Sequence, residues 1–144
     1  MSLSVTADLL MENYHKAYPT STLVIYKYAA PGGSSACRGN LLSHIQLIDQ
    51  DWLDIYKLTK SSELMMMTAD EIKSKAFPFV FDTKSETDSE KRCENLYESL
   101  NNTFPNYNVN VFVFKNNWSG SMTNTKGSVT FTKEYGSDVV IILN

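Results

Sequence analysis

The C-terminal third of the chain holds three strand-like segments, and these constrain the possible folds more than any other feature of the sequence. The segments NVNVFVF (108–114) and SVTFT (128–132) alternate with a period of two, whereas DVVIIL (138–143) is apolar after its first residue. A strand without polar positions is covered on both faces, so 138–143 is predicted to lie inside a sheet. Turn-like connections at 115–121 and 135–137 join the segments, and the sequence therefore predicts an antiparallel C-terminal meander.

Helical and strand patterns alternate in the first part of the chain. Apolar residues at helical spacing predict a helix between Ser4, a suitable N-cap, and Pro19, which ends it. The apolar run 22–26 predicts a central strand. Steps of four and three residues then predict an amphipathic helix along the stripe Leu41, Ile45, Ile48, Trp52 and Ile55.

The middle of the chain adds a short helix, a strand and a longer helix. Thr68 and Glu71 have the spacing of a capping box, which begins the short helix. The segment AFPFVF (76–81) predicts a strand, one that starts near Pro78 because proline lacks an N–H to donate. The longer helix ends at Pro105 and carries an apolar face of Cys93, Leu96, Tyr97 and Leu100.

This order of elements predicts an α/β or α+β fold. We expect a three-layer sandwich whose mixed sheet of about five strands has helices on its faces. At 144 residues the chain is expected to be one globular domain over 1–144, large enough to fold without a staple. The opening residues 1–3 are compatible with an expression remnant, which leaves a removed leader open.

Composition narrows the classes of function. The net charge is −3 and the 13 Lys and Arg residues are scattered, which disfavours nucleic-acid binding because that depends on clustered positive charge. No apolar run approaches the roughly 20 residues of a membrane span, and no signal peptide is visible. The sequence therefore predicts a soluble cytoplasmic protein.

A secreted protein is the alternative. Two glycosylation triplets, Asn101-Asn102-Thr103 and Asn117-Trp118-Ser119, would be modified only in a secretory setting. Cys37 and Cys93 could pair there, and closing that span would stabilise the fold by about 4 kcal/mol in the chain-entropy model.

The segment YAAPGGSSACRGN (28–40) is the most unusual stretch of the chain. It lacks the Gly-Lys-Ser/Thr ending of a phosphate loop and the G-x-G-x-x-G of a dinucleotide fingerprint. An anion site at the N-terminus of the following helix and a simple connecting turn both remain open. The candidate binding residues of this segment are Gly32, Gly33, Ser34, Ser35, Cys37, Arg38 and Asn40.

The order Thr6-Ala7-Asp8 on a helix, a buried strand, then Pro31-Gly32-x4-Cys37 before another helix resembles the core of the zinc-dependent nucleoside and polynucleotide deaminases. The resemblance covers about residues 4–60. It implies that Thr6 and Gly32 stand at two zinc-ligand positions, that Asp8 stands at the general acid/base, and that Cys37 alone matches a ligand. Because a catalytic zinc needs three protein ligands, the resemblance implies a degenerate core without zinc, and no cofactor is expected.

Other side chains offer weaker candidates. Cys37 could act as a nucleophile if His15 or His44 came within reach, although His44 would lie two turns further along the predicted helix. The acidic residues Asp49, Asp51 and Asp54 are expected on a solvated face, and the run Met65–Met67 is expected in the core or on a partner-facing patch.

Trp118 lies in the polar stretch KNNWSGS, where it could contact a partner or fold back on the sheet. The favoured function is a non-catalytic binding domain, possessing a deaminase-like fold without zinc, that takes a protein partner or a small ligand through the 31–40 loop and Trp118. The alternatives are the secreted, disulfide-linked glycoprotein with a binding role and the cysteine enzyme.

Overall fold

In a computed structural model of the chain, the described residues are 3–29, 34–37, 39–48, 50–58, 66–115, 117–122 and 125–144. They form three α-helices, a 3-10 helix and eight strands. In chain order these are α1 (Leu3–Ala17), β1 (Thr22–Tyr28), β2 (Ser34–Cys37), β3 (Asn40–Gln46), β4 (Trp52–Leu58), α2 (Ala69–Asp82), α3 (Ser89–Thr103), β5 (Val109–Phe114), β6 (Trp118–Met122), β7 (Gly127–Phe131), η1 (Lys133–Tyr135) and β8 (Asp138–Leu143).

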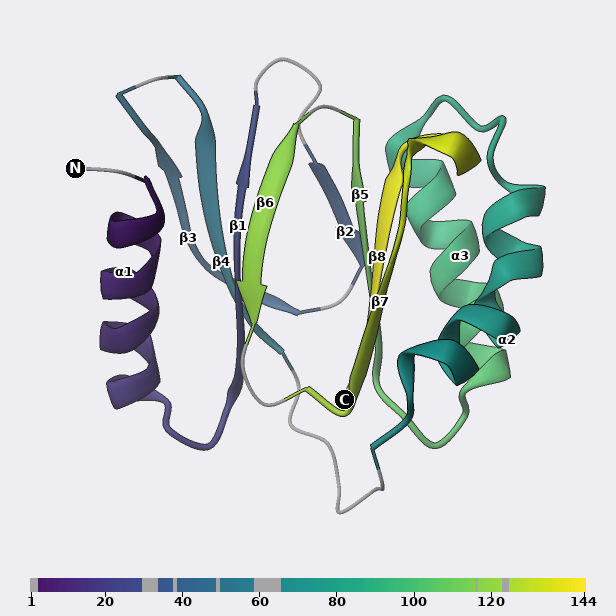
Figure 1. The fold of residues 1–144 in the computed structure, drawn as a ribbon, viewed down its shortest axis with the longest axis horizontal. Coiled ribbons are helices and arrows are strands. Elements are labelled where there is room, and N and C mark those ends of the chain that lie inside the picture. Colours follow the sequence, from purple (N-terminus) through teal and green to yellow (C-terminus); the bar gives the residue numbers. More distant parts are fainter. Residues whose placement is uncertain are drawn as a thin grey trace.

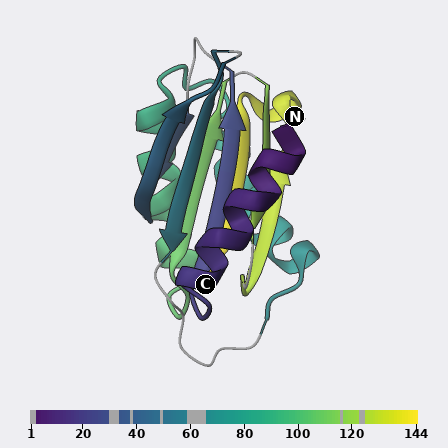
Figure 2. The same ribbon diagram turned by 90° about the vertical axis from the view of Figure 1, so that its left-hand side faces the viewer.

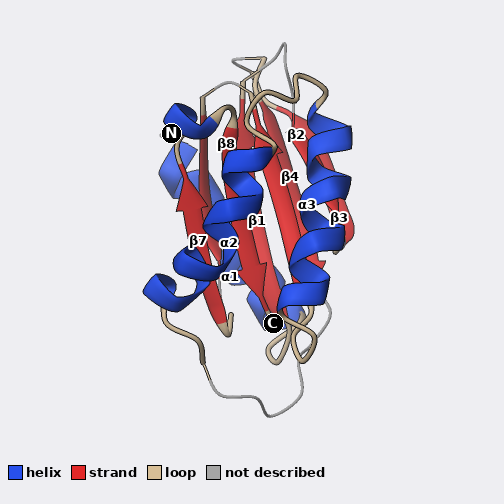
Figure 3. Cartoon of the chain, turned by 90° about the vertical axis from the view of Figure 1, so that its right-hand side faces the viewer, coloured by secondary structure: helices blue, strands red, loops and turns tan. Residues whose placement is uncertain are grey.

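The strands form two four-stranded sheets that lie face to face (Figure 1). Sheet A has the order β3-β4-β1-β6, and sheet B has the order β2-β5-β8-β7. Every recorded pair of neighbouring strands is antiparallel. Helix α1 lies on the outer face of sheet A (Figure 2), and α2 with α3 covers the outer face of sheet B (Figure 3). The arrangement is therefore four layers, helix–sheet–sheet–helix.

Each of the three interfaces between layers has its own apolar core. The largest joins α2 and α3 to sheet B and contains Ile72, Leu96 and Val111. The inter-sheet layer is rich in aromatic residues, because Tyr26 packs against Phe112 and Phe114 with ring centroids 4.8 and 4.9 Å apart. The smallest lies under α1 and contains Ile25, Leu53 and Ile55, with Leu10 and Tyr14 packed against it.

The α+β class is confirmed, and the helices predicted around 4–19 and 93–105 are present as α1 and α3. Strand β8 is internal, as its uniform apolarity predicts, because it lies between β5 and β7. The layer count differs from the expectation: the strands divide between two antiparallel sheets, so there is no single mixed sheet of five strands among the described residues. The C-terminal strands are antiparallel, but β6 pairs with β1 in sheet A and so leaves the meander.

The helix predicted from Leu41 to Ile55 is wrong, because this segment forms the β3–β4 hairpin. The steps of four and three residues span two strands and their turn. The turn is closed by hydrogen bonds from Leu47 N to Asp51 O and from Gln50 N to Leu47 O, and Gln50 has a φ of 73°. The turn between β3 and β4 thus interrupts an apolar spacing that looks like one continuous helix in the sequence.

The strand predicted over 76–81 is also wrong, because these residues belong to α2. Thr68 caps the helix by accepting from Glu71 N at 3.3 Å, which confirms the predicted helix start. Buried Ile72, Ala76 and Val80 then follow at helical spacing, so burial and capping outweigh Pro78 and the strand-forming composition.

The turn predicted over 115–121 contains strand β6, whose Gly and Ser residues are poor strand formers. It forms because pairing with β1 supplies its backbone hydrogen bonds.

Candidate functional site

Asp54 is the buried carboxylate of the molecule's inter-sheet layer. Strand β4 alternates, so that Leu53 and Ile55 pack in the core under α1 while Tyr56 joins the inter-sheet core. Asp54 lies on the same face as Tyr56, with 3% of the residue exposed. A carboxylate in such a place is tolerated only when donors surround it, because desolvation of the charge is costly.

Three side chains supply those donors, two from the neighbouring strands β1 and β3 and one from β4 itself. The Tyr28 hydroxyl, from β1, donates to Asp54 Oδ2 at 2.7 Å. His44 Nδ1, from β3, donates to Asp54 Oδ1. Tyr56, from β4 itself, hydrogen-bonds the same carboxylate. The β3–β4 register explains the histidine contact, because His44 and Asp54 are direct cross-strand partners whose side chains share a face.

Tyr56 of this group and nearby Tyr26 are held in their neutral, proton-donating form by a raised pKa. Burial, then the negative charge of Asp54 and the neighbouring Tyr28, raises the pKa of Tyr56 far above its ordinary value of 10.0. Burial also raises the pKa of nearby Tyr26, and the proximity of Tyr56 adds to the effect. A phenol that stays protonated can donate to a carboxylate across the whole physiological range.

His44 connects this buried cluster with solvent. Its ring stacks on Trp52, with centroids 4.1 Å apart and planes 5° apart, and its side chain is 45% exposed. The bond to Asp54 occupies Nδ1 and fixes the orientation of the ring, which leaves Nε2 as the ring's second polar atom. We refer to Asp54, His44, Tyr28, Tyr56 and Trp52 as the Asp54 cluster.

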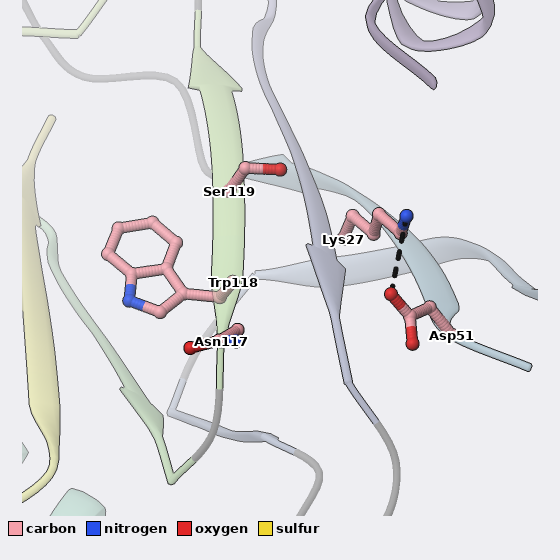
Figure 4. A pocket seen from close by; sticks show the side chains of 5 residues that line it. All are labelled: Lys27, Asp51, Asn117, Trp118 and Ser119. Atoms are coloured by element: carbon pink, nitrogen blue, oxygen red, sulfur yellow. Dashed lines mark ion pairs between the residues drawn. The ribbon is translucent and has the colours of Figure 1, made fainter. Parts of the chain in front are cut away.

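Trp118 folds back toward sheet B. Its ring stacks on Phe114 with centroids 4.6 Å apart, and its Nε1 donates to Asp138 Oδ2 at 2.8 Å. Figure 4 shows its indole on the opposite side of β6 from Ser119 and Lys27. Of the two placements left open for this residue, the structure has the one in which the ring packs on the sheet.

A shallow depression of about 220 Å³ lies beside β6 (Figure 4). It is lined by Lys27, Asp51, Asn117, Trp118 and Ser119. Lys27 Nζ and Asp51 Oδ2 pair at 3.2 Å, so the two charges at this depression neutralise each other. Asp51 and Asp54 consequently do not share the solvated face that the sequence predicted, since Asp54 is buried on the inter-sheet side.

The predicted 31–40 binding loop is in part a strand. Ser34–Cys37 forms β2, the outer strand of sheet B, paired with β5. Gly39 follows with a φ of +86°, and a Cβ there would lie 2.8 Å from Leu58 Cδ2, so only glycine fits this crossing from sheet B to sheet A. Asn40 is exposed and begins β3. Gly32, Gly33 and Arg38 lie outside the described residues, as do the side chains of Thr6, Asp8, Ser34, Ser35 and Cys37.

The structure describes the side chain of Cys93 and the backbone of Cys37. Cys93 is a buried thiol whose Sγ donates to Val111 O at 3.2 Å, and the backbone of Cys37 is the cross-strand partner of Val111. The disulfide stays a prediction. The argument that placed His44 two helical turns beyond Cys37 is wrong in its premise, because the two residues belong to strands β3 and β2.

The deaminase kinship likewise stays a prediction, although strands β3 and β4 stand where the resemblance implies a helix after Cys37. Among the described side chains, no three of His, Cys, Asp and Glu gather closely enough to hold a metal ion. None of the described helices has the length and apolarity needed to cross a membrane.

Sequence reasoning missed the Asp54 cluster. The signal was present as an alternation over 52–56, with Trp, Asp and Tyr on one face and Leu and Ile on the other. The helix assignment of the same residues concealed it. Comparison with known protein families, with curated proteins and with solved structures finds no match for this chain.

Proposed function

We propose that this chain is a non-catalytic interaction domain that binds an extended polypeptide segment along β3, one of the two outer strands of sheet A. The observation that carries the proposal is the exposure of this strand: Leu41 is 50% exposed and Ile45 is 42% exposed, and among the described residues β3 pairs with β4 alone. An outer strand presents a row of backbone donors and acceptors, which select a partner in extended conformation.

Strand β3 differs from the other outer strands in length and in side chains. It has seven residues, whereas β2, β6 and β7 have four, five and five. Ile48, at the turn that follows β3, is fully exposed and extends the apolar surface. Natural proteins protect an outer strand with lysine, proline or a bulge. Here only the register irregularity between Leu41 and Ser43 is present, and 43–46 pairs regularly with β4.

The Asp54 cluster prepares β3 for binding in this proposal. His44 ties one face of β3 to Asp54, and Ser43 Oγ on the other face lies 2.6 Å from the Tyr14 hydroxyl of α1. A strand that is already ordered loses less conformational entropy when a partner pairs with it. His44 and Asp54 are therefore positioning residues.

The test is selection of peptides from a random display library on the immobilised full chain, followed by affinity measurement. We expect extended peptides rich in β-branched residues. Ile45→Lys should weaken them by roughly tenfold or more, because it places an uncompensated charge against the bound strand. Phe77→Lys is the matched control, since Phe77 is 38% exposed on α2, on the far side of sheet B. Equal binding by Ile45→Lys and the wild type would contradict the proposal.

The orientation of His44 by Asp54 also favours a second candidate, an enzyme that uses His44 as a general base. Hydrolysis of p-nitrophenyl acetate by the wild type and by His44→Gln separates the two candidates. A rate that depends on His44 and falls as the imidazole is protonated would favour the enzyme, and equal rates would count against it. Mass measurement after alkylation of the denatured protein without reductant tests the secreted, disulfide-linked alternative, because a Cys37–Cys93 bond would leave both sulfurs unlabelled and two free thiols would both be labelled.

A further inference from the structure

We infer that the segment paired on β3 is β3 of a second copy of this chain, so that the protein forms a two-fold symmetric dimer with one sheet continuous across the interface. The inference rests on the proposed function, since it uses the same strand. It adds the identity of the partner.

The first argument is the position of the strand. Figure 2 shows β3 at the free side of sheet A, while α1 crosses the sheet nearer to β1. Helix α1 contacts β3 through the Tyr14–Ser43 hydrogen bond and through the core that contains Leu42, both on the face of the sheet. The line along which a further strand would add is therefore uncovered among the described residues.

The second argument is charge. The segment NLLSHIQ contains no Lys, Arg, Asp or Glu, so two antiparallel copies bring no like acidic or basic charges opposite each other. The chain as a whole carries a net charge of −3, which disfavours association of two copies through a charged face. An uncharged strand is the place where self-association meets the least repulsion.

The third argument is that a two-fold axis lets the same strand edge serve both partners, because an isologous interface uses the same surface on both subunits. The β3–β4 register pairs Leu41 with Tyr56 and Ile45 with Leu53, so the two exposed side chains lie on opposite faces of the sheet. A second copy of β3 paired along this edge would cover part of each. The remaining exposed apolar group of comparable size, Phe77 and Phe81 on α2, is already occupied in part: the Phe77 ring packs against Tyr135 and Lys84 Nζ lies 4.0 Å from the Phe81 ring centroid.

The test is sedimentation velocity on the full chain over about 1 to 500 µM, a range that covers dissociation constants of ordinary homodimers. We expect a dimer whose dissociation constant rises roughly 100-fold in Leu41→Lys and in Ile45→Lys, because each substitution places two like charges at the interface. Phe77→Lys should remain dimeric. Circular dichroism checks that each variant is folded.

Hydrogen exchange on the unmodified protein gives a second, independent readout. Amides of β3 should exchange more slowly as protein concentration rises, and those of β6, the opposite outer strand, should not change. A wild type that stays monomeric, or a dimer without protection at β3, overturns the inference. A monomer whose selected peptides still depend on Ile45 overturns the second copy as partner and leaves the proposed function standing, whereas a monomer without such peptides overturns both.

Discussion

The two most deeply buried charges among the described residues are satisfied in different ways. Arg92 is 1% exposed and Asp54 is 3% exposed. Arg92 donates mainly to backbone carbonyls: Nη1 to Ser137 O at 3.0 Å, and Nη2 to Val80 O at 3.2 Å and Tyr135 O at 2.6 Å. Asp54 instead receives its hydrogen bonds from the side chains of His44, Tyr28 and Tyr56.

The difference distinguishes a purely structural residue, Arg92, from a buried cluster around Asp54 that is in contact with solvent. Val80 is in the last turn of α2, where helix carbonyls lack intrahelical partners, so Arg92 closes that helix end and joins it to the segment before β8. Burial lowers the pKa of Arg92, but a guanidinium remains charged at any physiological pH. The partners of Asp54 are side chains on neighbouring strands, and one of them, His44, reaches solvent, so the geometry of the Asp54 cluster is open to contacts from outside the sheet.

The largest effect is expected at Arg92. Arg92→Met should lower the free energy of unfolding by about 3–5 kcal/mol, because several buried acceptors lose their donor at once. Urea unfolding measures the loss, and Lys91→Met, at an exposed neighbouring position, is the control. A loss below about 1 kcal/mol would contradict the architectural role assigned to Arg92.

Asp54→Ala should cost about 2–4 kcal/mol, because three buried or half-buried donors lose one acceptor. Unlike the Arg92 substitution, it should act first on β3, and hydrogen exchange should show faster opening of β3 than of β8. Asp51→Ala removes a partly exposed ion pair with Lys27 and should cost less than about 1 kcal/mol. If β3 and β8 opened equally in Asp54→Ala, the cluster would be as purely structural as Arg92.

Two neighbouring tyrosines on the same face of β1 should respond with opposite signs to loss of the hydroxyl. Tyr28→Phe removes a donor to the buried carboxylate and should cost about 1.5–3 kcal/mol. The Tyr26 hydroxyl is buried without a hydrogen-bond partner among the described residues, so Tyr26→Phe should raise stability by about 1 kcal/mol. Chemical unfolding measures the change in the free energy of unfolding for both variants. Equal decreases in the two would show that the Tyr26 hydroxyl does have a hydrogen-bond partner.

Alkaline pH should weaken the inter-sheet layer gradually. The pKa values of Tyr26 and Tyr56 are raised in the folded state, so between the ordinary value of 10.0 and the folded value the unfolded chain releases protons that the folded chain keeps. Stability is therefore full below pH 10 and falls above it, by about 1.4 kcal/mol per pH unit for each tyrosine. Urea midpoints measured between pH 9 and 11 should show a shallower fall for Tyr26→Phe; an unchanged slope would contradict the assignment.

The sequence predicted elements whose patterns are uninterrupted and local. Helix α3, strand β1 and strand β8 follow from their own residues, and Thr68 marks the start of α2. The β3–β4 hairpin could not be predicted because its turn lies inside an apolar spacing that also fits a helix. Strand β6 could not, because its pairing with β1 spans most of the chain.

The same limit applies to the candidate site, because the sequence shows local patterns but not contacts between paired strands. The predicted binding residues around 31–40 were chosen by local composition, whereas the Asp54 cluster depends on cross-strand register. His44 and Asp54 become neighbours only once 40–58 is recognised as two paired strands. Tyr28 joins them through a second pairing, between β1 and β4, that no local pattern specifies.

The exchange of one strand between the sheets has a consequence for how the chain folds. Sheet A takes three strands from before α2 and β6 from after α3, whereas sheet B takes β2 from the first part and three strands from the last. During synthesis, sheet A is incomplete until β6 has left the ribosome, and sheet B is incomplete until β8 has. The two halves should consequently fold as one late, cooperative event, and neither fragment alone should acquire a native core.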